Sequence, residues 1–289
     1  MRVNVGLAQM APKLGDLQNN LESHLALAER ARDAGVDLLV FPELSLTGYQ
    51  VMDLVPELAM QADAQDATFA ALLEASRDFD LDLVVGFVHV DRRQRFTIAQ
   101  AWLSGGECLH VHHKLYLPTY TLFDDGRYFA QGNQVRAFET RFGRVGMLIC
   151  EDFWHLSAPW LLWMDGADLL VFANSSPTRG ISSREGGRLT VARWVELMNQ
   201  ACASTFTNYV IMCNRVGYED GKNFWGGSLI ANPEGELLAQ APYFEETLLL
   251  QEIDLNQLRR TRAHMPLLRD ERPYLVQREL ARILEKERE

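Results

Sequence analysis

Three residues of complementary chemistry each follow a predicted strand of this sequence. Glu43 comes after residues 36–41, Lys114 comes after the stretch L-H-V-H-H, and Cys150 comes after residues 145–149. Short apolar runs bounded by charged or turn-forming residues predict buried strands. Polar groups just beyond buried strands meet at one edge of an α/β sheet, where the ligand sites of such sheets lie. We therefore expect this carboxylate, ammonium and thiol to share one pocket.

Together, these three groups can act on an electrophilic carbon. The thiol of Cys150 attacks a carbonyl or nitrile carbon, and the carboxylate of Glu43 takes the thiol proton and later gives it to a leaving amine. The ammonium of Lys114 and the backbone N–H of Glu151 stabilise the oxyanion. Each residue alone also has a structural interpretation, as a turn residue, a solvated charge or a packed thiol. Their joint placement favours the catalytic interpretation.

The position of Cys150 also bears on its protonation. It stands between a predicted strand and residues 157–164, which can form a helix. Backbone N–H groups at the start of a helix favour the anionic thiolate, which is the reactive form. We therefore expect a lowered thiol pKa at Cys150.

The rest of the chain supplies elements that can position these groups. Strands and helices alternate in the first part of the sequence, and strands cluster later, which predicts α/β layers with helices covering the faces of sheets. Residues 114–134 form a long irregular stretch, and loops of this length are usually functional. Helices are predicted at 19–34, 64–79, 157–164, 184–205 and 279–289, and strands at 3–8, 36–41, 83–88, 96–103, 107–113, 145–149, 168–173, 209–214, 227–232, 237–240 and 248–253.

Composition excludes several classes of protein. The chain has 289 residues, 47% of them hydrophobic, and a formal net charge of −11, which argues against a nucleic-acid or anionic-membrane surface. Its four cysteines show no close pairing and indicate free thiols in a reducing compartment. The N-terminus has no apolar signal-peptide core, and no apolar run reaches the ~20 residues that span a bilayer. We expect a cytoplasmic protein.

Three segments resemble the signatures of the nitrilase superfamily of carbon–nitrogen hydrolases. These are F-P-E-L-S-L-T-G-Y, H-K-L-Y-L-P-T-Y and L-I-C-E-D-F-W, in the family's order of Glu, Lys and Cys. The resemblance implies an α/β fold of the four-layer α-β-β-α sandwich type, as a single domain over 1–289 with 255–289 as a C-terminal extension. It also implies catalytic Glu43, Lys114 and Cys150, a thioester acyl-enzyme, no metal or organic cofactor, and a homodimer. The dimer contacts would come from the C-terminal extension and from Trp154, Trp160 and Trp163.

One position departs from the family pattern. The family usually carries a second glutamate in the motif F-x-E-x-R-Y-F, whereas this chain reads F-D-D-G-R-Y-F and places Asp125 there. Aspartate is one methylene shorter, so its reach toward Lys114 or a substrate differs by about 1 Å, which is enough to matter for catalysis. We expect Asp125 to act as a supporting carboxylate with altered geometry.

Further residues are weaker candidates. Four of them can line the substrate pocket, although each also fits a core or turn position: Tyr49, Tyr120, Trp154 and Asn174.

Two other kinds of site lack part of their residues. His110, His112 and His113 could hold a metal ion, but no acidic or cysteine cluster completes the site. Cys150 and His155 can pair as in cysteine proteases, but a third orienting group is lacking. Cys202 and Cys213 fit packing positions.

The substrate stays open at the level of sequence. C-E-D-F-W and A-P-Y-F-E-E resemble the glutaminase domain of glutamine-dependent NAD synthetases, so a small primary amide such as glutamine is the first choice. The C-terminal P-L-L-R-D-E-R-P resembles the tails of N-carbamoyl-amine hydrolases, which are the alternative. An alternative of another class is a weakly catalytic or non-catalytic subunit that binds a separate synthetase or delivers ammonia to it.

Overall fold

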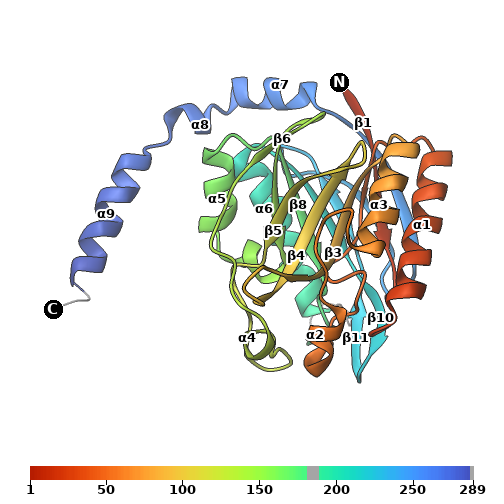
Figure 1. Ribbon diagram of the computed structural model, residues 1–289. Coiled ribbons are helices and arrows are strands. Elements are labelled where there is room, and N and C mark those ends of the chain that lie inside the picture. The colour runs from red at the N-terminus through yellow and green to blue at the C-terminus, as the bar shows by residue number, and fades with distance from the viewer. Residues whose placement is uncertain (181–188, 287–289) are drawn as a thin grey trace.

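Two six-stranded sheets packed face to face form the centre of the molecule (Figure 1). The computed structural model describes residues 1–180 and 189–286. The first sheet has the order β14 (Thr247–Asp254), β1 (Arg2–Gln9), β2 (Leu38–Val40), β3 (Asp82–Val90), β4 (Phe96–Ser104) and β5 (Glu107–His113). The second has the order β13 (Leu237–Gln240), β12 (Leu229–Ala231), β9 (Tyr209–Asn214), β8 (Leu169–Asn174), β7 (Gly143–Ile149) and β6 (Phe138–Thr140).

Helices cover the outer face of each sheet. Helices α1 (Leu17–Asp33) and α3 (Ala67–Asp78) lie on the first sheet, and α5 (Ser157–Met164) and α6 (Thr190–Phe206) lie on the second (Figure 1). The aspartates Asp16 and Asp66 cap the first two helices by accepting hydrogen bonds from backbone N–H groups of the first turn. The predicted four-layer α-β-β-α sandwich is therefore confirmed.

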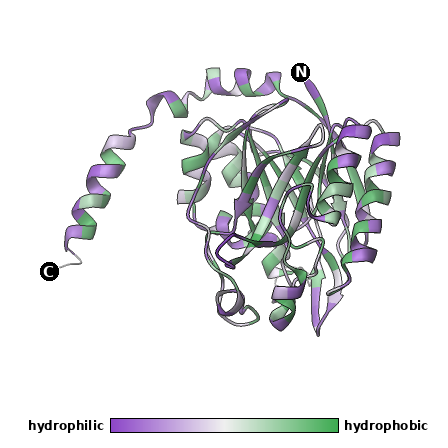
Figure 2. Cartoon of the chain, viewed as in Figure 1, coloured by the Kyte–Doolittle hydropathy of each residue, from purple (hydrophilic) through white to green (hydrophobic). Residues whose placement is uncertain are grey.

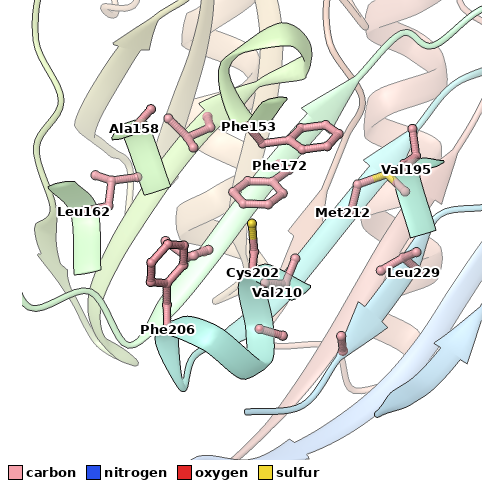
Figure 3. Close-up of a cluster of buried hydrophobic side chains, with 14 of the residues drawn as sticks. Phe153, Ala158, Leu162, Phe172, Val195, Cys202, Phe206, Val210, Met212 and Leu229 are labelled. Carbon is pink, nitrogen blue, oxygen red and sulfur yellow. The ribbon is translucent and has the colours of Figure 1, made fainter. Parts of the chain in front are cut away.

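Apolar side chains fill all three spaces between these layers. One cluster lies between α1, α3 and the first sheet, and a second between the two sheets. The third joins the second sheet to α5 and α6, and Figure 3 shows Phe153 and Phe172 at its centre with Cys202 nearby. The two phenyl rings stack at 5.3 Å. Strands β2 and β7, which precede Glu43 and Cys150, are thus largely buried on both faces, which explains their nearly continuous apolar sequences, whereas the edge strand β5 before Lys114 is only partly buried.

Most predicted elements are present, and the differences are local. Helix α6 begins at Thr190, and residues 184–188 of its predicted range lie outside the described residues. The hairpin of β10 (Val216–Glu219) and β11 (Lys222–Trp225) was not predicted, because its residues show neither clear alternation nor an apolar run. Further short elements were also missed: η1 (Met52–Leu54), α2 (Val55–Leu58), α4 (Asp125–Tyr128), β6 and η2 (Cys150–Trp154).

The C-terminal segment is partly packed on the body. Helix α7 (Asn256–His264) is anchored by Leu258, which is buried in the cluster between the sheets, and by Arg262, which lies 2.6 Å from Asp168. After α8 (Leu267–Asp270), helix α9 (Pro273–Lys286) has no buried residue and stands away from the body (Figure 1). Figure 2 shows green and purple segments alternating along it. Among the described residues, none of the helices is long and apolar enough to cross a bilayer.

A glycine in β3 fixes the segment that carries Glu43. A Cβ atom at Gly86 would lie 2.5 Å from the backbone of both Leu44 and Pro42, so Gly86→Ala must displace this segment. We expect a loss of about 1–3 kcal/mol in the free energy of unfolding, measured by urea denaturation. The control is Gly6→Ala, whose Cβ would meet only movable side chains at 3.0 Å or more. Equal losses in the two variants would contradict this account.

Candidate active site

The catalytic candidates come from both sheets. Glu43 follows β2 and Lys114 directly follows β5, both in the first sheet, whereas Cys150 directly follows β7 in the second. The expectation of a single sheet edge is therefore wrong. Strands β2 and β5 run in the same direction, so their carboxyl ends lie at the same edge of the first sheet. The face-to-face packing of the sheets then brings Cys150 close enough to interact electrostatically with Glu43 and Lys114.

A buried ammonium between two carboxylates forms the centre of the site. The Nζ atom of Lys114 lies 2.7 Å from Oε1 of Glu43 and 2.7 Å from Oδ2 of Asp125. Lys114 and Glu43 are fully buried, and Asp125 is 5% exposed. Asp125 begins the one-turn helix α4, which brings its backbone close enough for the shorter side chain to reach Lys114 directly. The supporting carboxylate thus contacts the lysine despite the missing methylene.

The second oxygen of each carboxylate also has a donor. The hydroxyl of Tyr49 donates to Oδ1 of Asp125 at 2.7 Å, and the backbone N–H of Ser175 donates to Oε2 of Glu43 at 2.8 Å. The Ser175 hydroxyl also donates to the backbone carbonyl of Glu43 at 2.9 Å. Tyr49, predicted to line the pocket, therefore lies in the site and orients Asp125.

Cys150 occupies a sharp elbow between β7 and the 3-10 turn η2. Its φ angle is +47°, in the left-handed region that non-glycine residues rarely adopt. Such conformations cost of order 1–3 kcal/mol and persist only where the surrounding structure fixes them. Cys150 is 7% exposed, so a small reactant that reaches the site meets the sulfur at the end of a buried strand.

Burial controls the protonation of the site. It raises the pKa of the Cys150 thiol well above the ordinary value; Glu43 adds to this shift, and Lys114 only partly opposes it. The expected lowered thiol pKa is therefore wrong, because desolvation of the anion outweighs the turn that follows. Burial also raises the pKa of Glu43 to about 6, against the attraction of Lys114. Burial disfavours the charged form of Lys114, yet Asp125 and Glu43 hold the pKa of its ammonium well above the usual range.

These shifts define what each group can do at neutral pH. The thiol of Cys150 carries its proton, Glu43 is mostly ionised and can accept one, and Lys114 is a fixed cation. A general base whose pKa lies near the working pH can both accept and return a proton. The arrangement can therefore perform nucleophilic attack with proton transfer through Glu43.

Two further predicted residues connect the nucleophile turn to the long loop. The carboxylate of Glu151, which follows Cys150, accepts a hydrogen bond from the hydroxyl of Tyr120, 3.0 Å from each oxygen. The ring of Tyr120 packs edge-on against Phe123, which lies in the same loop. Tyr120 is 46% exposed, so it lies at the surface next to the site.

Asn174 and Trp154 lie in different surroundings. Ile149 pairs with Ala173, which places Asn174 beside Cys150 at the ends of neighbouring strands. Asn174 is buried, and neither polar atom of its side-chain amide has a hydrogen-bond partner among the described residues. Buried polar groups are normally satisfied, so this amide is available to a reactant. Trp154 instead stacks on Phe153 and lines a hollow with residues of α6.

The alternative histidine sites are not assembled. His112 contacts Asp152 at 2.9 Å, His113 contacts the hydroxyl of Thr97 at 2.8 Å, and His110 stacks on a phenylalanine ring. Within the described residues, no group of three His, Cys, Asp or Glu side chains is arranged to hold a metal ion. His155 stacks on a tyrosine ring at 3.6 Å and lies 3.9 Å from the carboxylate of Glu151.

Cys202 and Cys213 are packing residues, as predicted. Cys202 lies in the cluster beneath α6, and Cys213 lies between the two sheets. Burial raises the pKa of Cys202 to about 12 and shifts the pKa of Cys213 in the same direction. Both thiols are therefore neutral and enclosed by apolar side chains.

Sequence reasoning missed several residues that support the site. The fully buried Arg215 lies 2.6 Å from Glu219, and Glu219 accepts hydrogen bonds from the backbone N–H groups of Tyr49 and Gln50. The i, i+4 spacing of this arginine and glutamate in R-V-G-Y-E was the available signal. Asp152 and Ser175 were also missed, although both lie within or beside the motifs already quoted.

Comparison with known proteins identifies the family of this chain. Residues 4–263 match the family model described as carbon-nitrogen hydrolase. The chain belongs to the carbon–nitrogen hydrolase family. The inferred superfamily and the prediction of an enzyme that acts on carbon–nitrogen bonds are thereby confirmed.

Individual relatives and solved structures within the family are similar to this chain. A glutamine-dependent NAD(+) synthetase of Acinetobacter baylyi is 33% identical over 256 residues, covering 88% of this chain and 45% of the relative. The solved structure of the Acinetobacter baumannii enzyme of that name superposes with a TM-score of 0.80 at 31% identity, covering 89% of this chain and 47% of that one. A carbon-nitrogen hydrolase of Helicobacter pylori matches with a TM-score of 0.86 at 23% identity, covering 97% of this chain and 99% of that one. The chain thus spans less than half the length of the synthetases.

The raised pKa of Glu43 generates a prediction about pH dependence. Below about pH 6 this carboxylate is protonated and cannot accept the thiol proton, so kcat/KM should fall as the pH drops through that value. The measurement is ammonia release from an amide across a pH series. The Glu43→Gln variant should lose most activity at every pH, since base catalysis is worth roughly 10²–10⁴. A midpoint near the ordinary glutamate value of about 4.3 would contradict this assignment.

Proposed function

We propose that this carbon–nitrogen hydrolase is an amidase that cleaves a small primary amide through a cysteine thioester. One observation supports this most strongly: Lys114 is bonded to both Glu43 and Asp125 in the buried site where Cys150 forms its strained elbow. This set supplies a nucleophile, a base and a cation to one carbonyl group. Small amides, unlike larger polymers, suit a site whose nucleophile is 7% exposed and whose charged groups are at most 5% exposed.

In the acylation half of the proposed reaction, Glu43 accepts the proton of the Cys150 thiol as the sulfur bonds to the amide carbon. The carbonyl oxygen becomes an oxyanion, which the ammonium of Lys114 and the backbone N–H of Glu151 stabilise. The carbon–nitrogen bond then breaks, and Glu43 gives its proton to the departing nitrogen. Ammonia leaves, and the acyl group stays on Cys150 as a thioester.

Deacylation returns the enzyme to its starting state. Water gives a proton to Glu43 and attacks the thioester carbon, and the second oxyanion is stabilised by the same donors. The carbon–sulfur bond breaks, the sulfur of Cys150 regains the proton from Glu43, and a carboxylic acid is released. Asp125 keeps Lys114 in place throughout, because it holds the ammonium by a bond of its own besides the bond from Glu43.

Glutamine or a glutamine-like ω-amide is the proposed substrate. The support is the similarity at 33% identity to a relative named a glutamine-dependent NAD(+) synthetase. Beside the nucleophile, the unpartnered amide of Asn174 offers one donor and one acceptor to such a substrate. N-carbamoyl amines are the alternative substrates. The alternative of another class is a weakly catalytic or non-catalytic subunit that binds a separate synthetase or delivers ammonia to it, and the same substrate panel tests it.

The proposal predicts a covalent adduct on a single cysteine. Incubation with glutamine or short aliphatic amides, followed by acid quenching and mass spectrometry, should show the acyl mass on Cys150 and ammonia in solution. Cys150→Ala should lose both signals and keep its fold, because a small residue replaces a small one. Cys108→Ala, which removes a partly exposed thiol elsewhere, should retain both.

Other outcomes of the same experiment decide between the candidates. Release of both ammonia and CO₂ from N-carbamoyl amines, with every simple amide inert, would replace the glutaminase-like choice by the alternative. Turnover by Cys150→Ala would contradict the mechanism itself. Failure of all substrates, with an intact fold, would favour the non-catalytic subunit.

We also propose that the protein is cytoplasmic. The support is the state of the cysteines, since Cys108, Cys150, Cys202 and Cys213 are all free. Disulfides form and persist in oxidising compartments and are rare in the cytosol.

We also propose that two copies of the chain associate. Helix α9 carries an apolar stripe at i, i+4, i+7 and i+8 that has no partner within the described part of its own chain: Val276, Leu280, Ile283 and Leu284. A helix this short is marginal in water without packing. The outer face of α5 and α6 exposes a second apolar set: Leu156, Leu161, Trp194 and Leu197.

In a two-fold dimer, α9 of each copy packs on the outer face of α5 and α6 of the other copy. Both apolar surfaces are then covered, because a two-fold axis repeats each contact. The sequence-based choice of contact residues needs correction. Trp163 is 3% exposed and belongs to the chain's own core, and Trp160 donates to Glu271 at 3.1 Å. Trp154 is also partly buried against Phe153. The available surface is the aliphatic set just described, together with Trp194.

Charges in the stripe of α9 should prevent this association. The double variant Leu280→Glu with Ile283→Glu should give a monomer mass by light scattering at micromolar concentration, where the unmodified chain gives a dimer. The matched control is Arg278→Glu with Arg282→Glu on the opposite face of the helix, which should remain a dimer. A monomeric unmodified chain, or a dimer that survives the first pair, would contradict the proposed contact.

A further inference from the structure

Asp152 ties together the two chain segments that carry the nucleophile and the lysine. Its Oδ2 atom accepts a hydrogen bond from the backbone N–H of Ile149 at 3.0 Å, just before Cys150. Its Oδ1 atom accepts hydrogen bonds from the backbone N–H groups of Leu115 and Tyr116 at 2.9 and 3.0 Å, just after Lys114. One fully buried carboxylate thus spans the two sheets at the site.

His112 completes the surroundings of this carboxylate. Its Nε2 atom lies 2.9 Å from Oδ2 of Asp152, and its ring is almost fully buried at 3% exposure. The bond requires the imidazole proton on Nε2, since an ionised carboxylate only accepts. His112 and Lys114 lie on the same strand end, so this contact adds a second link between β5 and the turn after Cys150.

The core packing of Phe153 also holds the turn that carries Cys150. Phe153, the next residue along, stacks on Phe172 at 5.3 Å in the core beneath α5 and α6 (Figure 3). The turn is therefore anchored in the core and cannot shift to restore the hydrogen bonds of Asp152 if these bonds are lost. The position of the Lys114 segment relative to the Cys150 elbow then depends on the bonds of Asp152.

We propose that Asp152 is a positioning residue that sets the spacing between the Cys150 sulfur and the Lys114 ammonium, with His112 orienting its carboxylate. It acts through the backbone and touches neither of these reacting groups. The inference rests on the proposed function in one respect: the spacing matters for catalysis only if Cys150 and Lys114 act on the same substrate. Its chemistry is specific: all four partners are donors, so only a group with acceptor capacity on both oxygens satisfies them.

The test replaces the carboxylate by its nearest isostere. Asp152→Asn keeps the volume but turns one acceptor into an NH₂ group that faces N–H donors. We expect kcat/KM for amide hydrolysis to fall by about 10²-fold with KM nearly unchanged, because misplacement by about 1 Å has that cost. Alkylation of Cys150 by iodoacetamide should slow as well. Both are measured below the unfolding transition of each variant.

The matched control is a buried aspartate at the other end of the first sheet. Asp82 is 1% exposed and accepts hydrogen bonds from Trp102 and Ser104 at 2.8 and 2.7 Å. Asp82→Asn should lower stability in the same way and leave kcat and the alkylation of Cys150 unchanged. Equal effects of the two variants on both rates would overturn the positioning role.

The His112 variants keep the proposal testable if Asp152→Asn fails to fold. Gln at position 112 can still donate to Asp152, whereas Ala cannot, so His112→Gln should retain more of kcat than His112→Ala. Equal loss in both variants would count against the role of this bond. The alkylation rate needs no substrate, so it reports on the positioning of Cys150 even if every amide proves inert and the proposed function is wrong.

Discussion

The structure depends on one buried ammonium held between two carboxylates. A charge without partners in a protein interior is very costly, and Lys114 is fully buried. Its bonds of 2.7 Å to Glu43 and Asp125 require three chain segments to meet at one point: the end of β2, the end of β5 and the start of α4. Removing Lys114 would leave two buried carboxylates without a counter-charge, so the geometry of the site and the stability of the fold share the same contacts.

This charge arrangement also determines how the nucleophile works. Burial, reinforced by the negative charge of Glu43, raises the pKa of Cys150 and keeps its thiol protonated. Burial, reinforced by the charge of Asp125, raises the pKa of Glu43 to about 6 although Lys114 opposes this shift. The thiolate therefore forms only as the sulfur attacks, with Glu43 as the acceptor of its proton. A site that keeps its thiol neutral between turnovers is also protected from oxidation, since susceptibility follows thiolate character.

Much of the fold and the identity of the main site residues could be predicted from sequence, and the two predictions used different signals. The buried strands are nearly continuous apolar runs, so β7, β8 and β9 were evident, whereas the β10–β11 hairpin has no such pattern. Glu43, Lys114 and Cys150 were found because each follows a predicted strand and lies in a segment that resembles a family signature. The sequence could not show that Cys150 belongs to the other sheet, because sheet order is a long-range property. Nor could it show the thiol pKa, which depends on burial by residues distant in sequence.

The charge state of Lys114 is the most direct test of this account. A ¹⁵N-labelled sample should show a protonated Lys114 Nζ signal at neutral pH that persists well above the ordinary lysine range, because two carboxylates hold its proton. The signal should become sensitive to pH in the double variant Glu43→Gln with Asp125→Asn. A neutral Lys114 amine near pH 7 in the unmodified chain would contradict the central claim, since the site would then lack its fixed cation.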